Sequence, residues 1–111
     1  MAIRSNVLDV LCGVRALLSV PERWTQGHEA RDAAGEPVDP DDRGACCWCP
    51  RGAVMRLRGH NWLAGAGALL ALDSAANRHG SPLIEDYNDR SCRTHGEVLA
   101  LLDYLITEDS S

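Results

Sequence analysis

The stretch Thr94-His95-Gly96-Glu97-Val98-Leu99-Ala100-Leu101-Leu102 decides the fold class of this chain. Thr94 and Glu97 stand three residues apart, which is the capping-box pattern that begins a helix. The apolar residues that follow recur at helical spacing. We therefore expect a helix that begins at Thr94 or His95 and buries one apolar face.

Similar patterns upstream predict four more helices, bounded by residues that start or stop a helix. The first helix has Ser5 or Asn6 as its N-cap and ends before Pro21, and the second begins at Cys49-Pro50 and ends near Gly59. The third spans about Trp62 to His79, with Gly80 as its stop. A short fourth helix follows Pro82 and stops before Asn88-Asp89. The run of Ala and Gly over 64–68 would let a neighbouring helix approach the third helix closely.

The segment before the second helix carries turn signals rather than helical spacing. Asp32 and Gly35 form an Asp-x-x-Gly pattern between short extended stretches, which is typical of a hairpin or tight loop. We expect this hairpin and an acidic loop over about residues 24–45. The fold prediction is therefore mainly α: a single domain over 1–111, built as a small bundle of four to five helices with a short β-hairpin or loop insertion.

Charge limits the classes of partner. The chain has 111 residues, 11 basic and 16 acidic, for a net charge of −5. Residues 29–42 hold six of the acids and one Arg, which accounts for the whole net charge, and we expect this segment to be exposed. A nucleic-acid partner is not expected, because phosphate binding needs clustered cations.

Apolar patterning bears on localisation. Asp9 and Arg15 interrupt the N-terminal apolar stretch, which argues against a signal peptide. The uncharged run 59–72 is too short to span a bilayer. We therefore expect a cytoplasmic protein with no membrane partner, and its five cysteines are expected to be reduced.

Two short segments carry the candidate chemistry: Cys46-Cys47-Trp48-Cys49 and Cys92-Arg93-Thr94-His95. Each leads into an expected helix, so the two segments could converge. Cys46, Cys49, Cys92 and His95 have the ligand types of a structural zinc site. Against zinc, neither segment has the glycine that usually tightens a knuckle turn. We expect no cofactor, with zinc as the alternative.

Catalysis is a second interpretation of these residues. A thiol at a helix N-terminus has a lowered pKa, and Cys49 stands at such a position. His95 could act as its base, with Asn88 or Asp89 orienting the imidazole, as in cysteine hydrolases. Little chain remains, however, to build a substrate cleft.

The third interpretation is structural, and we favour it. Free cysteine is often buried as a small hydrophobic residue, and His95 beside a capping threonine can donate a hydrogen bond to a loop carbonyl. Cys49 and His95 are then expected to lie near each other in the core, while Asn88 and Asp89 form a turn or cap.

Several blocks of the chain together resemble an uncharacterised family of short proteins from bacteria and their phages. The blocks are Arg23-Trp24-Thr25-Gln26-Gly27, Ala30-Arg31-Asp32, Gly35-Glu36-Pro37-Val38, Trp48-Cys49 with Gly52-Ala53, Tyr87-Asn88-Asp89, and Arg93-Thr94-His95 with Glu97-Val98-Leu99-Ala100-Leu101-Leu102-Asp103. The resemblance implies a shared fold and no established activity. It includes the positions of Cys49 and His95 but not regularly Cys46, Cys47 or Cys92, which counts against a zinc site common to the family.

Two classes of function follow. The first is a small acidic helical module that binds a protein partner or a small ligand, such as an accessory protein carried by phage or mobile DNA. The second is a small thiol hydrolase-like enzyme using Cys49 and His95, and a zinc-stapled form of either is an alternative. The first is favoured, because no complete catalytic motif is present. An enzyme should show both side chains at the floor of an open cleft.

Overall fold

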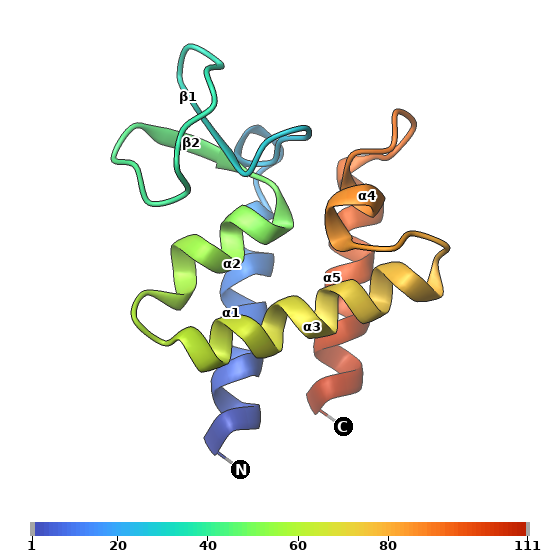
Figure 1. The fold of residues 1–111 in the computed structure, drawn as a ribbon. Helices are drawn as coiled ribbons and strands as arrows, with labels where there is room; N and C mark the ends of the chain where they lie inside the picture. The colour runs from blue at the N-terminus through green and yellow to red at the C-terminus, as the bar shows by residue number, and fades with distance from the viewer. Residues whose placement is uncertain (1, 111) are drawn as a thin grey trace.

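The computed structural model describes residues 2–110, with side chains for 6–108. These residues form five α-helices, a short 3-10 helix and a two-stranded sheet (Figure 1). The elements are α1 (Ala2–Leu18), η1 (Pro21–Arg23), β1 (Ala30–Asp32), β2 (Ala45–Trp48), α2 (Pro50–Arg58), α3 (Trp62–Arg78), α4 (Ile84–Asn88) and α5 (His95–Ser110). The predicted fold class, a mainly α bundle with a hairpin insertion, is confirmed. None of the described helices is long and apolar enough to cross a membrane.

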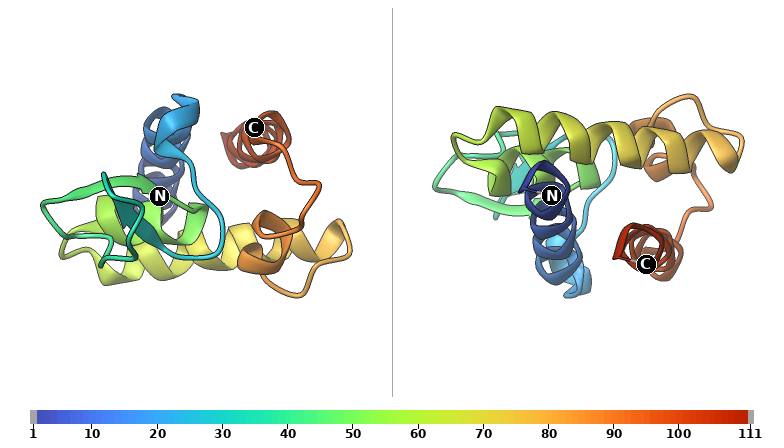
Figure 2. Two further views of the ribbon diagram at one scale, coloured as in Figure 1. Left: turned by 90° about the horizontal axis from the view of Figure 1, so that it is seen from above. Right: turned by 90° about the horizontal axis from the view of Figure 1, so that it is seen from below.

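The helices pack in two directions. α1 and α5 run antiparallel to each other, and α3 lies across both (Figures 1 and 2). α1 packs against α2, α3 and α5, so it is the central element of the bundle. The sheet and α4 lie at the end of the bundle where α1 ends and α5 begins (Figure 1).

The sheet differs in extent from the expected hairpin. The turn is as predicted, because the N–H of Gly35 donates to the carbonyl of Asp32. However, β1 also pairs antiparallel with β2, which includes Cys46 and Cys47. No strand was expected in that segment. It is a strand because β1 lies alongside it, and this pairing partner is not evident from the local sequence.

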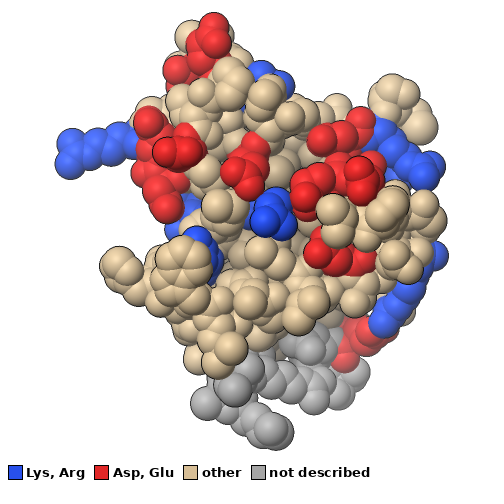
Figure 3. Space-filling view, viewed as in Figure 1, with Lys and Arg blue, Asp and Glu red and all other residues tan. Residues whose placement is uncertain are grey.

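The acidic segment is mostly at the surface, as predicted. Acidic side chains gather over the hairpin (Figure 3), and Glu36, Asp39, Asp41 and Asp42 are exposed while Glu29 and Asp32 are half-buried. Its backbone is nevertheless held against α2. Arg56 donates to the carbonyls of Pro40 and Asp42, at 3.2 and 3.1 Å. The indole of Trp48 also donates to Pro40, at 3.0 Å.

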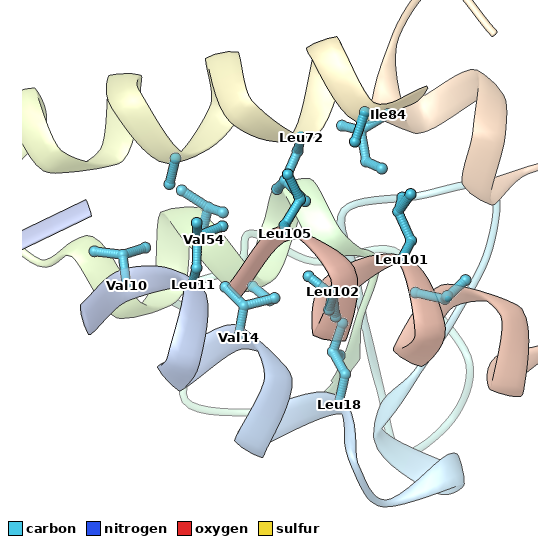
Figure 4. Close-up of a cluster of buried hydrophobic side chains, with 14 of the residues drawn as sticks. Val10, Leu11, Val14, Leu18, Val54, Leu72, Ile84, Leu101, Leu102 and Leu105 are labelled. Atoms are coloured by element: carbon cyan, nitrogen blue, oxygen red, sulfur yellow. The ribbon is translucent and has the colours of Figure 1, made fainter. Parts of the chain in front are cut away.

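One apolar core joins all five helices (Figure 4). Its fully buried large side chains are Leu11, Val14 and Leu18 of α1, Val54 of α2, Leu72 of α3, Ile84 of α4, and Val98 and Leu102 of α5. The small residues of α3 allow close packing, as expected. A Cβ on Gly67 would lie 2.5 Å from the side chain of Val7 on α1.

The helix boundaries test the start signals. α5 begins at His95, and the Oγ1 of Thr94 accepts from the N–H of Glu97 at 3.1 Å while the Glu97 carboxylate accepts from the N–H of Thr94 at 2.9 Å. The capping box is confirmed. The prediction for α1 is wrong, because the helix begins at Ala2 and Ser5 lies inside it. Ile3 and Val7 extend the apolar spacing by one turn, and this outweighs the weak preference of serine for a cap.

Candidate functional site

Cys49 is the N-cap of α2. Its Sγ accepts from the N–H of Gly52 at 3.4 Å, and Pro50 occupies the first helical position. The side chain is buried, and burial raises the pKa of the thiol from 9.0 to about 11, although the N–H groups of Gly52 and Arg51 favour the thiolate. The expectation of a lowered pKa is wrong here, because loss of solvent outweighs the helix N-terminus.

His95 is the first residue of α5 and faces the end of α1. Its Nε2 lies 2.6 Å from the carbonyl oxygen of Leu18, so this nitrogen carries the proton and donates it. The imidazole also contacts the indole of Trp24, with ring centroids 5.7 Å apart. These contacts tie the start of α5 to the end of α1, which is the structural role that the sequence favoured.

Asn88 and Asp89 bind the loop that follows η1 rather than an imidazole. The fully buried Asn88 accepts from the indole N–H of Trp24 at 2.7 Å and donates to the carbonyl of Thr25 at 3.0 Å. Asp89 accepts from the N–H of Gly27 at 2.9 Å. Both the oxygen and the nitrogen of the Asn88 side-chain amide are thus hydrogen-bonded.

Further bonds extend this network along the same loop. Gln26 donates to the carbonyls of Asn88 and Arg90, at 2.6 and 3.0 Å. Arg31 donates to the hydroxyl of Thr25 and to the carbonyl of Gln26, both at 3.0 Å. Three of the blocks that carry the family resemblance, those around Trp24, Arg31 and Asn88, are therefore joined by polar contacts.

Two of the predicted catalytic residues, Cys49 and Asp89, line one pocket. Cys49 lines a small pocket of about 210 Å³ between α2, α4 and the loop that precedes β1. The residues around it are Gly27, His28, Glu29, Arg51, Glu85 and Asp89. His95 is not among them, and its polar partner is on α1. The histidine that shares this pocket with Cys49 is therefore His28 rather than His95.

The predicted zinc ligands are also separated. Cys46 is exposed on β2 and donates to the carbonyl of Gly44, and Cys92 is exposed in the loop before α5. Cys49, by contrast, is buried. Within the described part of the chain, no three Cys, His, Asp or Glu side chains lie close enough to hold a metal ion.

A larger groove opens on the other side of α4, between the C-terminal end of α3 and α5. It has a volume of about 600 Å³. Its lining, which we call the α3–α5 groove, comprises Arg78, His79, Tyr87, Arg93, Glu97, Ala100, Leu101 and Tyr104. None of these was a candidate from the sequence. The spacing of residues 97, 100, 101 and 104 on one helix face was the available signal.

The inner wall of the groove is rigidly built. The guanidinium of Arg93 lies over the ring of Tyr87, 3.6 Å from its centroid, and Arg93 also donates to the Tyr87 carbonyl at 2.9 Å. The imidazole of His79 also contacts the ring of Tyr87, with ring centroids 5.8 Å apart. Arg93 also pairs with Glu97, whose pKa is lowered first by the N–H of Thr94.

The outer wall is more exposed. Tyr104 is 49% exposed and the Arg78 side chain 53%. Arg78 donates to the hydroxyl of Tyr104 at 3.3 Å and to the carboxylate of Glu108 at 3.2 Å. Arg78 and Tyr104 are thus open to solvent, whereas Tyr87 is buried and the Arg93 side chain is 12% exposed.

Comparisons with known proteins place the chain in a family without assigning a function. No curated protein matches it, and no solved structure does. One family model matches residues 3–108, nearly the whole chain. The resemblance inferred from the sequence blocks is thus confirmed, and the chain belongs to DUF6197, a family of unknown function.

Proposed function

We propose that this protein is a binding module and that the α3–α5 groove takes a short segment of a protein partner. One observation carries the proposal: a groove of about 600 Å³ is lined by two tyrosines, two arginines and a histidine around an apolar floor. That volume is within the usual range of ligand sites. Tyrosine and arginine are also the residue types most enriched where partners bind tightly.

The state of the cysteine supports binding over thiol catalysis. With a pKa of about 11, the Cys49 thiol is almost entirely protonated at neutral pH, and the thiolate is the reactive form. Its Sγ is buried against Gly52 instead of facing the α3–α5 groove. Cys49 therefore acts as a helix cap in this proposal.

The charges of the groove indicate what kind of segment it would take. Arg78, His79 and Arg93 line it, against the single carboxylate of Glu97. Arg78 is more than half exposed, so it can turn from Glu108 toward a bound carboxylate. Leu101 and Ala100 provide the apolar floor. The proposed segment thus has an apolar or aromatic side chain next to an acidic residue.

Peptide display followed by mapping tests this proposal. Peptides selected from a random library against the folded protein should carry an aromatic or apolar residue beside Asp or Glu. In amide NMR spectra they should shift the signals of α4 and α5 most strongly. Tyr104→Ala and Arg78→Ala should each weaken binding by about five- to thirty-fold, which corresponds to about 1 to 2 kcal/mol.

Val20→Ala is the matched control, because Val20 is similarly exposed but lies outside the groove. It should bind the selected peptides as the wild type does. Selected peptides that shift other surfaces, or that bind the Tyr104 and Arg78 variants with unchanged affinity, would refute the proposal.

A further inference from the structure

α3 presents an uncharged outer face that no other described element covers. Trp62, Leu63 and Leu70 are 67, 63 and 69% exposed, and Ala66 between them is exposed as well. Figure 3 shows an uncharged area over α3, with charged side chains above it and around its C-terminal end. Single exposed leucines are ordinary, but aligned ones on one helix face mark a contact surface.

This face is separate from the face that builds the fold. Ala64, Ala68 and Leu72 point into the core, and they lie on the opposite side of α3 from Leu63 and Leu70. The two leucines are seven residues apart, which is two helical turns or about 10 Å. Their exposure has no role in the packing of the monomer.

The two ends of the outer face differ: an exposed aromatic side chain stands at one end and a hollow at the other. At the N-terminal end, the projecting indole of Trp62 carries the guanidinium of Arg58 at 3.6 Å from the ring centroid. At the C-terminal end lies a shallow hollow of about 400 Å³. The hollow is lined by Leu70, Asp73, Ser74, Asn77, Arg78 and Pro82. Trp62 stands four residues before Ala66, and Leu70, at the near edge of the hollow, stands four residues after it.

We propose that a second copy of this chain covers the outer face, with the two α3 helices antiparallel about a two-fold axis near Ala66. In a two-fold pair each contact occurs twice. Trp62 and Leu63 of each copy fill the hollow beside Leu70 of the other, and Arg58 meets Asp73. Ala66, at the centre, leaves room for the helices to approach.

Charge favours an antiparallel second copy over a parallel pair and over an anionic membrane. A parallel pair would place Arg58 against Arg58 and Asp73 against Asp73, which is unfavourable. An anionic membrane is disfavoured by the net charge of −5 and by Asp73, which lines the hollow on this face. A second copy supplies the neutral centre and the opposite charges without any further component.

The contact area sets the strength of the dimer. Trp62, Leu63 and Leu70 each expose about two thirds of a large side chain, or on the order of 400 Å² of apolar surface together. Stable interfaces bury about 800 Å² on each partner, including polar surface. The dimer is therefore weak, with a dissociation constant in the micromolar range, and it forms only as concentration rises.

Sedimentation equilibrium over about 10 to 500 μM should show this reversible dimer. Leu70→Glu places a charge at the centre of the contact and should weaken association at least ten-fold. Because Leu70 is exposed, circular dichroism and the melting temperature should be unchanged. Val20→Glu is the matched control and should dimerise as the wild type does. A monomer at every concentration, or a dimer unaffected by Leu70→Glu, would overturn the proposal.

Cysteine cross-linking tests the orientation. In a background with Cys12, Cys46 and Cys92 changed to Ser, Ala66→Cys should form a disulfide-linked dimer on mild oxidation, whereas Asn77→Cys should not. Efficient cross-linking through Asn77→Cys would indicate a parallel pair and contradict the two-fold arrangement. Loss of the dimer in Tyr104→Glu, with Leu70→Glu unaffected, would place the contact in the α3–α5 groove instead.

Discussion

Gly52→Ala tests the closest approach between α2 and the chain that leads into β1. Gly52 lies in the first turn of α2, and a Cβ there would overlap the carbonyl oxygen of Glu29 and lie 2.7 Å from its carbonyl carbon. These are backbone atoms, so they cannot rotate away as a side chain would. The same carbonyl accepts from the N–H of Cys49 at 3.2 Å. The methyl group must therefore displace the start of the hairpin.

The expected change in the free energy of unfolding of Gly52→Ala is the sum of opposing effects. In an unobstructed helix, Gly→Ala stabilises by about 1 kcal/mol. At Gly52 the overpacked methyl group costs about 1 to 3 kcal/mol. Breaking the hydrogen bond between Cys49 and Glu29 costs about 1 kcal/mol more. We therefore expect a net loss of about 2 kcal/mol in the free energy of unfolding.

Urea denaturation measures this change as a lower midpoint with an unchanged slope. Gly96→Ala is the matched control, because Gly96 occupies the first turn of α5 and its nearest neighbour to a new Cβ is the Thr94 hydroxyl at 4.0 Å. It should leave stability unchanged or raise it by up to about 1 kcal/mol. A Gly52→Ala protein as stable as the wild type would refute the close-approach argument.

Three further changes probe the cap, the buried network and the thiol. Thr94→Ala should lower the free energy of unfolding by about 1 kcal/mol in the same assay, because the backbone N–H of Glu97 loses the Thr94 hydroxyl as its acceptor. An unchanged midpoint would contradict the cap. Asn88→Ala should cost about 3 kcal/mol by calorimetry, since the indole N–H of Trp24 loses its acceptor; a loss below about 1 kcal/mol would mean that the network is dispensable. Between pH 9 and 11 the wild type should lose about 2 to 3 kcal/mol in urea titrations, because the unfolded thiol releases its proton near 9.0 and the folded Cys49 only near 11. Cys49→Ser does not ionise in this range and should lose less; equal losses would disprove the thiol as the cause.

Much of the fold was predictable because its signals are local. The box of Thr94 and Glu97, the proline at position 50 and the glycine at 80 each set a helix end through contacts within a few residues. β2 was missed because its pairing with β1 joins residues that are 13 to 18 positions apart, such as Asp32 with Ala45 and Ala30 with Trp48. The cysteine spacing around Cys46 drew attention to a metal knuckle instead. A strand of four residues has too short a pattern to outweigh that motif.

The candidate site was harder to predict because it depends on burial. The position of Cys49 at a helix N-terminus was correct, but the sequence does not show that the thiol is covered. For His95, a bond to a loop carbonyl was predicted, whereas the acceptor is the carbonyl of Leu18 at the end of α1. The groove combines Arg78 from α3 and Tyr87 from α4 with one face of α5. Only its α5 part follows from spacing; the rest requires the tertiary arrangement.

The polar network around Asn88 also positions the inner wall of the α3–α5 groove. Trp24 donates to the side chain of Asn88, and Gln26 donates to the backbone carbonyls of Asn88 and Arg90. The segment that starts at Asn88 connects α4 to α5. Tyr87 immediately precedes it, and Arg93, near its end, donates back to the Tyr87 carbonyl. The inner wall of the groove is therefore positioned by a loop from the N-terminal half of the chain. A polar network costs free energy when any member is unpaired, so its use here is better explained by fixing Tyr87 and Arg93 in place than by stability alone.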